Sequence, residues 1–327
     1  MRSIALPKAK RVSKDKPFAI ASRRSPLAMA QARQVQAMIA RAAGVSRDDV
    51  PVQDYVSTGD RNLQGSLADI GGKGLFTKEI EEALLNGAAR FAVHSMKDMP
   101  AESPPGLVTA AIPAREDPRD VFISFVAKTP WDLPEGARVG TASVRRAAQL
   151  LARRPDLKVV PLRGNVGTRL DKLERGEADA TFLALAGLNR LELEGHATAV
   201  MATDEMLPAV GQGALCVQTR EDDDEARAIA ASFNCAETSA CVIMERAFLT
   251  GLDGSCRTPI GGLALIEHDE IRFEGELLSL DGKERFVARR RLAYGEGCAM
   301  EAGRLGAEAA KELRDAAGPD FFKRLEG

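Results

Sequence analysis

The sequence predicts an α/β protein built from two similar α/β lobes, followed by a small α+β domain. Three observations lead to this prediction. Strands alternate with helices over residues 18–94, the alternation repeats over residues 139–185, and residues 271–316 instead contain a hairpin and one long helix. The alternation is typical of an α/β domain with a largely parallel sheet. A chain of 327 residues is long enough for two or three domains.

The first lobe begins with a short buried strand at residues 18–22. Ser25 then stands at the N-cap and Pro26 at the first position of a helix, which Gly44 ends. The rest of the lobe is expected to contain a strand at 52–56, a helix at 75–85 and a strand at 90–94.

The second lobe repeats the pattern. Its expected elements are a strand ending at 139–140, a helix at 143–153, a strand at 157–160, a helix at 166–174 and a strand at 179–185. In open α/β sheets, ligands bind beyond the carboxyl ends of the strands. Two such lobes side by side therefore predict a ligand cleft between them.

The C-terminal part follows a different pattern. Two strands, at residues 271–278 and 285–292, flank Asp281-Gly282, a pair that favours a tight hairpin turn. A long helix is expected near residues 300–316. This arrangement predicts a small α+β domain.

Composition and charge exclude several classes of protein. The net charge is only −2 at pH 7, which gives no reason to expect nucleic acid or an anionic membrane as a partner. No apolar run approaches the roughly 18 residues that cross a bilayer. Residues 1–17 are basic and lack the apolar stretch of a secretory signal, so we interpret them as a disordered basic tail and expect a cytoplasmic protein.

The cysteines and histidines do not predict a disulfide or a metal site. The five cysteines are odd in number and form no CxxC pair, and the three histidines lie far apart without HExxH spacing. Four cysteines fall in strand-like or helix-like segments. Cys256 instead lies in a glycine-rich loop beside Arg257, which predicts an exposed and reactive thiol.

Arginines collect where the predicted strands meet the following helices. These residues are Arg23, Arg145, Arg146, Arg163, Arg169 and Arg190. Arginine binds carboxylates and phosphates through a bidentate fork. Two of the arginines stand in the first turn of a helix, which is unfavourable for a cation unless an anion lies nearby. A nearly neutral chain with this pattern is predicted to bind a small or medium-sized polyanion.

Two further loops carry polar groups. Residues 94–98 read His-Ser-Met-Lys-Asp directly after a buried strand, and loops held by a rigid scaffold often carry function. Residues 71–76 place Lys73 in a glycine-rich loop at a helix start. This loop is not a Walker A motif, because Gly74 stands where Ser or Thr follows the lysine.

These segments, in this order, resemble the porphobilinogen deaminase family. The matching stretches are SRRSPLAMAQA, GGKGLFTKEIEEALL, AVHSMKDMP, REDPRDVFIS, GTASVRRAAQL, LRGNVGTRLDKLERGEADA, LPAVGQGA and GSCRTPIGG, which together run from about residue 18 to residue 262. The C-terminal domain matches more in size and pattern than in motif.

The resemblance implies a domain division and a monomer. It places domain 1 at residues 18–115 together with a return segment at 213–233, domain 2 at 116–212, and domain 3, which carries the cofactor cysteine, at 234–327. The two lobes are then similar to those of periplasmic binding proteins.

The resemblance also implies an activity and a site. Family members join four porphobilinogen molecules into the linear tetrapyrrole hydroxymethylbilane, on a dipyrromethane cofactor that Cys256 would hold through a thioether. Asp98 corresponds to the catalytic acid/base. Residues expected to bind the cofactor are Lys97, Ser95, Thr141, Ser143, Arg145, Arg146 and Gly187. Residues expected to bind the substrate are Arg23, Ser25, Arg163, Arg169, Arg190, Phe76 and Gln212, with Lys73 in a mobile loop.

Three positions depart from the family pattern, and two other functions stay open. Ala142, Asp69 and Arg257 replace the Ser, Lys and Gln that are familiar there, which affects affinity rather than the reaction. One alternative is a two-lobed anion-binding protein of the transport type, which would give Cys256 no role. The other is a transferase with a cysteine nucleophile and no pyrrole cofactor.

Overall fold

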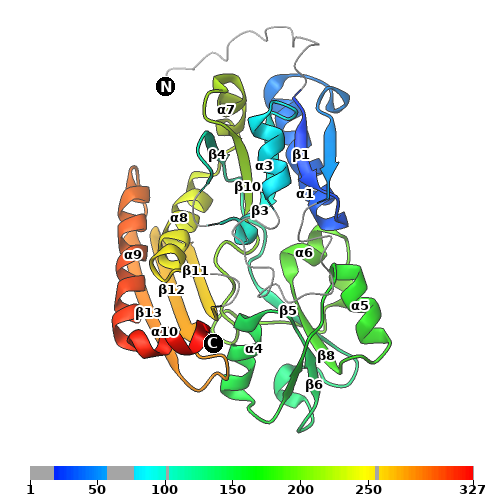
Figure 1. Ribbon diagram of the computed structural model, residues 1–327, viewed down its shortest axis with the longest axis vertical. Coiled ribbons are helices and arrows are strands. Elements are labelled where there is room, and N and C mark those ends of the chain that lie inside the picture. The colour runs from blue at the N-terminus through cyan, green and yellow to red at the C-terminus, as the bar shows by residue number, and fades with distance from the viewer. Residues whose placement is uncertain (1–17, 57–76, 101–102, 255–257, 327) are drawn as a thin grey trace.

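The computed structural model describes residues 18–56, 77–100, 103–254 and 258–326, and it contains two lobes and a third domain beside them (Figure 1). The basic tail predicted at residues 1–17 lies outside the described residues. In the described ranges, no helix combines the length and the apolar character needed to cross a membrane.

The first lobe is a five-stranded sheet with helices on both faces. Its strands are β1 (Ile20–Arg23), β2 (Val52–Tyr55), β3 (Phe91–Ser95), β4 (Leu107–Ala111) and β10 (Leu215–Arg220), in the order β2-β1-β3-β10-β4. Its helices are α1 (Pro26–Ala43), α3 (Lys78–Leu85) and α7 (Asp224–Ala231). Alternate residues of a strand point to opposite faces. Ile20 therefore packs with α1 and α7, whereas Ala21 packs with α3.

Helix α1 begins and ends where its capping residues predict. The Ser25 side chain accepts a hydrogen bond from the backbone nitrogen of Ala28 at 3.3 Å. Pro26 is the first helical residue, and Gly44 ends the helix in the left-handed conformation with φ of 66°. The cap at Ser25 thus fixes the point at which the chain leaves β1 and turns into the helix.

The second lobe repeats the strand order of the first. Its strands are β5 (Asp120–Ser124), β6 (Arg138–Gly140), β7 (Lys158–Val160), β8 (Ala180–Ala184) and β9 (Ala199–Val200), in the order β7-β6-β8-β5-β9. Its helices are α4 (Val144–Arg153), α5 (Val166–Glu174) and α6 (Leu185–Arg190). Helices α4 and α5 belong to separate apolar clusters of this lobe.

The sheets are largely parallel, as predicted, but each contains one antiparallel strand that was not predicted. In the first lobe β1 pairs in parallel with β2 and β3, but β10 runs antiparallel to both β3 and β4. In the second lobe β5 likewise runs antiparallel to β8 and β9. The reason is the chain path: β5 and β10 follow the two segments that connect the lobes, and each enters its sheet from the opposite end.

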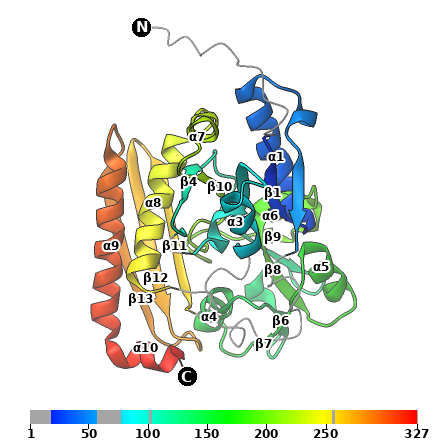
Figure 2. The ribbon, with the colours of Figure 1, turned by 45° about the horizontal axis from the view of Figure 1, so that its top comes forward.

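The third domain packs two long helices on a three-stranded antiparallel sheet (Figure 2). Its strands are β11 (Ile260–Glu267), β12 (Glu270–Leu278) and β13 (Arg285–Ala293), and its helices are α8 (Ala236–Gly251), α9 (Cys298–Ala317) and α10 (Pro319–Glu326). The predicted hairpin and long helix are confirmed. The division of the chain into residues 18–115 with 213–233, 116–212 and 234–327 stays our proposal.

Four short 3-10 segments complete the described elements. They are η1 (Arg47–Asp49), η2 (Met96–Asp98), η3 (Pro130–Asp132) and η4 (Glu194–His196).

Candidate active site

The η2 turn follows β3 directly and carries two charged side chains, Lys97 and Asp98. Asp98 is 38% exposed, and its Oδ2 lies 3.9 Å from a guanidinium nitrogen of Arg23. Ser95, at the end of β3, exchanges hydrogen bonds with the side chain of Gln31 in α1. Arg23, Ser25, Ser95 and Asp98 line one small pocket, so four of the predicted residues are brought together at the carboxyl ends of β1 and β3.

Arg145 and Arg146, hereafter the arginine pair, are buried at the start of α4 and share one carboxylate. Arg145 donates to Oδ2 of Asp120 at 2.8 Å, and Arg146 donates to Oδ1 of Asp120 at 2.7 and 3.2 Å. Ser143 caps the helix by accepting from the backbone nitrogen of Arg146. The anion that the sequence led us to expect at this helix start is therefore provided, in this structure, by the chain itself.

Asp120 was not predicted to be a site residue. It is the first residue of β5, is fully buried, and belongs to the matched stretch REDPRDVFIS. Burial alone would raise the pKa of its carboxyl, but the arginine pair outweighs burial and holds the pKa well below its usual range. The signal available in the sequence was one aspartate at the head of an apolar strand.

The positive charges of the site exceed its buried negative charge. Lys97 is accessible to water, yet the surrounding protein lowers its pKa to about 8, first by desolvation and then by repulsion from Arg146. Desolvation, followed by repulsion from Arg146, also lowers the pKa of Arg169 to about 10. Partial desolvation and neighbouring cations both lower the pKa of lysine and arginine side chains. The site therefore favours added carboxylates.

Gln212 joins the two sides of the site. It is 1% exposed, its Oε1 accepts from Nζ of Lys97 at 3.2 Å, and its Nε2 donates to Oδ1 of Asp120 at 3.0 Å and to the carbonyl of Pro118 at 2.6 Å. Both ends of the amide are thus engaged within the protein.

The remaining predicted arginines lie on the second lobe. Arg169 donates from Nε to the carbonyl of Gly164 at 2.7 Å, and Arg190 donates to the carbonyl of Gly213 at 2.8 Å. Nε of Arg190 has no acceptor among the described residues. Arg163 precedes the loop that leads into α5 and is half-buried.

Two further predicted residues are small and buried. Thr141 is buried and accepts from the backbone nitrogen of Ser143 at 3.1 Å. Gly187 is buried in α6, where a Cβ would come 3.6 Å from Leu27 of α1. Gly187 therefore lies where the two lobes touch.

Two family models match the chain. "Porphobilinogen deaminase, dipyromethane cofactor binding domain" matches residues 18–228, and "Porphobilinogen deaminase, C-terminal domain" matches residues 239–315. The chain belongs to the porphobilinogen deaminase family. The first model spans most of the chain, including both lobes and the η2 turn.

Curated relatives of this family match over nearly the full chain. The porphobilinogen deaminase of Nitrobacter winogradskyi is 52% identical over 94% of this chain and 96% of its own. That of Paracoccus denitrificans is 48% identical over 94% of this chain and 96% of its own. Among solved structures, the methionine-binding protein MetQ aligns over 68% of this chain and 91% of its own, at 12% identity and a TM-score of 0.43.

Cys256 is the residue that we expect to hold the cofactor in this member of the porphobilinogen deaminase family. It lies outside the described residues, as do Lys73 and Phe76. Two other cysteines are buried, and burial raises the pKa of Cys216 to about 11 and of Cys241 to about 12. Thiols with such pKa values are poor nucleophiles near neutral pH. His94 is buried in β3, and desolvation lowers its pKa to about 4, so it is neutral.

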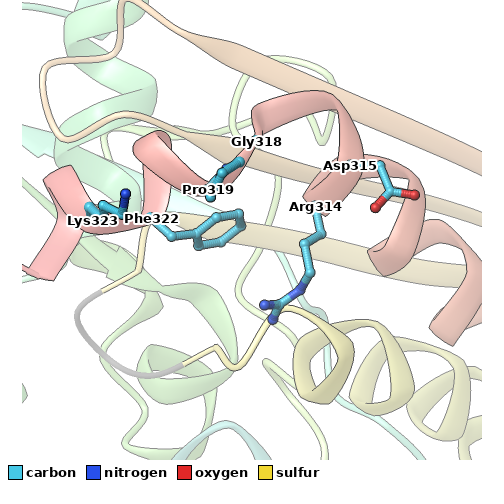
Figure 3. A pocket seen from close by; sticks show the side chains of 6 residues that line it. All are labelled: Arg314, Asp315, Gly318, Pro319, Phe322 and Lys323. Atoms are coloured by element: carbon cyan, nitrogen blue, oxygen red, sulfur yellow. The ribbon is translucent and has the colours of Figure 1, made fainter.

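The residues before Cys256 are held by the third domain. Arg314 of α9 donates to the carbonyl of Gly251 at 3.1 Å and pairs with Asp253 at 2.5 Å. Figure 3 shows Arg314 pointing toward the end of α8, beside a hollow of about 520 Å³ that Phe322 and Lys323 also line. The η2 turn contributes no residue to the lining of this hollow.

The described residues fit the dipyrromethane cofactor of this family. Nε of Arg145 is buried without an acceptor among the described residues, as is Nε of Arg190. A buried N–H donor without a partner leaves room for an acceptor, which a carboxylate of the cofactor would supply. The part of the chain that the structure describes contains no group of three or more His, Cys, Asp and Glu side chains that could hold a metal ion.

Proposed function

We propose that the chain condenses four porphobilinogen molecules head to tail into hydroxymethylbilane and releases ammonia at each condensation. One observation carries this proposal: Asp98 is an accessible carboxylate set among cations of both lobes. The family match supplies the reaction class, and the geometry supplies an acid/base together with anion-binding groups. The relatives' shared name supports the same activity.

We propose that Asp98 performs the proton transfers. Its carboxyl group would protonate the amine that leaves the aminomethyl group of porphobilinogen, and its carboxylate would then stabilise the cationic pyrrole. After the α-carbon of the growing chain attacks the electrophilic methylene carbon, the carboxylate would accept the proton that this α-carbon loses. A guanidinium nitrogen of Arg23 lies 3.9 Å from Oδ2 of Asp98.

We propose that Cys256 holds the dipyrromethane, and that the second lobe and the η2 turn bind its carboxylates. When bound, the cofactor supplies the α-carbon from which the tetrapyrrole chain grows. The proposed contacts are Ser95, Lys97, Thr141, Ser143, Arg145, Arg146 and Gly187. The arginine pair would bind an incoming carboxylate with the donors that Asp120 leaves over, among them Nε of Arg145.

We propose that the substrate's acetate and propionate groups bind to the remaining cations. Arg23 lies next to Asp98, and desolvation and Arg146 make Arg169 a cation in need of an anion. The proposed substrate contacts are Arg23, Ser25, Arg163, Arg169, Arg190, Phe76 and Gln212, with Lys73 as a further cation. Finally, we propose that the protein works as a monomer in the cytoplasm.

The Asp98→Asn variant tests the proposed role of Asp98. Asparagine keeps the size of the side chain but cannot transfer a proton, so turnover should fall by about 10² or more while fold and bound cofactor remain. Mass spectrometry of the linear tetrapyrrole and ammonia release per product measure the outcome. Near-normal turnover would remove Asp98 from the mechanism. If the unaltered protein binds porphobilinogen without releasing ammonia, the anion-binding alternative replaces this function.

A further inference from the structure

A hydrogen-bonded series of three side chains, Asp120, Gln212 and Lys97, connects the second lobe to the η2 turn of the first; Asp120 and Gln212 are buried. Asp120, the first residue of β5, has no exposed surface, and Gln212 is 1% exposed. Oδ1 of Asp120 accepts from Gln212 at 3.0 Å, and Oε1 of Gln212 accepts from Lys97 at 3.2 Å. Lys97 adjoins Asp98 in the same turn, so two hydrogen bonds separate Asp120 from the neighbour of the proposed acid/base.

Gln212 also links the two segments that connect the lobes by hydrogen bonds. Gln212 lies in the segment that returns to the first lobe, and it donates to the carbonyl of Pro118 in the outgoing segment at 2.6 Å. The carbonyl of Gln212 accepts from Arg115 at 2.8 Å. Buried polar groups that are fully hydrogen-bonded hold one geometry. The η2 turn and the arginine pair are therefore fixed relative to each other by this amide.

Asp120 has no surface with which to touch a ligand. Asp98 is 38% exposed and Lys97 is accessible, whereas Asp120 is fully buried. Both carboxylate oxygens of Asp120 also accept hydrogen bonds from the protein, Oδ2 from Arg145 and Oδ1 from Arg146. It can therefore influence the reaction only through the side chains that it contacts.

We propose that Asp120 is a positioning residue that acts through Gln212 to keep Lys97 charged and in place beside Asp98. This links the carboxylate-binding arginines of the second lobe to the acid/base of the first. The proposal rests on the proposed function, because it is that function which makes Asp98 the acid/base.

The charges around Lys97 give the direction of the effect. The arginine pair repels the Lys97 ammonium, and Asp98 and Asp120 attract it. Removal of the Asp120 charge leaves the repulsion and takes away one of the two attractions. A lysine that loses a neighbouring anion gives up its proton at lower pH. The pKa of Lys97, already lowered to about 8, should therefore fall further.

The test measures Lys97 directly in an Asp120→Asn variant. An amine-reactive acylating reagent modifies only the neutral amine, so the labelling rate of the Lys97 peptide as a function of pH gives its titration. All variants would carry Cys256→Ala, so that none holds the cofactor. We expect the midpoint to move to lower pH by about one unit. In the Cys256 protein, the alkaline limb of kcat/KM should move in the same direction.

Asp223→Asn is the matched control. Asp223 is also a buried carboxylate paired with an arginine, Arg90, but it caps α7 and is not part of the hydrogen-bonded series that leads to Lys97. The Asp223→Asn substitution should lower the melting temperature and leave the Lys97 titration unchanged. An Asp120→Asn variant that behaves like this control, less stable but with an unmoved titration, would show a merely structural role and overturn the proposal.

A second variant decides the matter if Asp120→Asn fails to fold. Gln212→Met keeps the volume and removes all three side-chain hydrogen bonds, to Lys97, Asp120 and Pro118, so it should also lower the Lys97 midpoint; an unchanged midpoint would overturn the proposal. If both variants fold, the double variant should shift the midpoint by less than the sum of the two, because they interrupt one path. Additive shifts would contradict that path. The labelling needs no porphobilinogen, so failure of the proposed function would appear separately, as absence of tetrapyrrole from the unaltered protein.

Discussion

At the scale of single residues, the site separates reactive groups from the groups that hold them. Asp98 and the arginines could be predicted, because each stands at a strand end within a motif. Asp120 could not, since its importance comes from two arginines that meet it only in the folded chain. The double use of Gln212, toward Lys97 and Asp120, depends equally on the return of the chain between the lobes.

The low pKa of Lys97 predicts a pH dependence of binding. The pKa is lowered from 10.5 to about 8, so the ammonium is charged below about pH 8 and is lost as pH rises through that value. Because Lys97 is a proposed contact of the cofactor on which each condensation takes place, kcat/KM for porphobilinogen should fall above about pH 8. Lys97→Arg should remove this fall, since arginine stays charged. Lys158→Arg, at an exposed position of β7, is the control and should keep the fall. Equal alkaline profiles for Lys97→Arg and the unaltered protein would contradict the assignment.

At the scale of elements, local capping signals were reliable, whereas the one antiparallel strand of each sheet could not be predicted. Ser25, Pro26 and Gly44 determine both ends of α1 from neighbouring residues alone. The direction of β5 and β10 depends instead on the path that the chain takes between lobes, which no local pattern records. Helix α8 was not predicted, because its inward face is recognised only once α9 packs beside it.

The packing of α8 on α9 requires a glycine at position 306. A Cβ there would lie 2.2 Å from the carbonyl oxygen of Met244. Alanine ordinarily favours a helix over glycine by about 1 kcal/mol, but this overlap should reverse the effect. We expect Gly306→Ala to lower the free energy of unfolding by roughly 1–3 kcal/mol in denaturant titration. Gly295→Ala, with no atom within 4 Å of the new Cβ, should change it little. A more stable Gly306→Ala variant would show that the helices can move apart freely.

At the scale of the whole molecule, one buried carboxylate joins all three parts of the chain. Glu245 of α8 is fully buried, pairs with Arg115 at 2.5 Å, and accepts from the backbone nitrogens of Gly211 at 2.7 Å and Ala264 at 2.9 Å. The third domain is thus fixed to the segments that connect the lobes. A buried charge that loses its partner is strongly destabilising. A domain motion that separates Glu245 from Arg115 would therefore cost free energy, and this limits how independently the domains can move.

The sequence predicted the architecture of two lobes and a smaller domain because strand and helix periodicity repeats along the chain. It could not predict that β10 returns to the first sheet, except through the family resemblance. Family membership is shown by the models that match residues 18–228 and 239–315. The attachment of the cofactor to Cys256 is the claim on which the proposed function most depends.

The mass of the denatured protein tests this claim most directly, measured beside a Cys256→Ala variant. The account predicts an excess over the sequence mass equal to two linked pyrroles, present in the unaltered protein and absent from the variant. If the unaltered protein shows no excess, and prior incubation with porphobilinogen produces none, the chain carries no such cofactor. An equal excess in both proteins would place the cofactor on another residue. Either result would contradict the account.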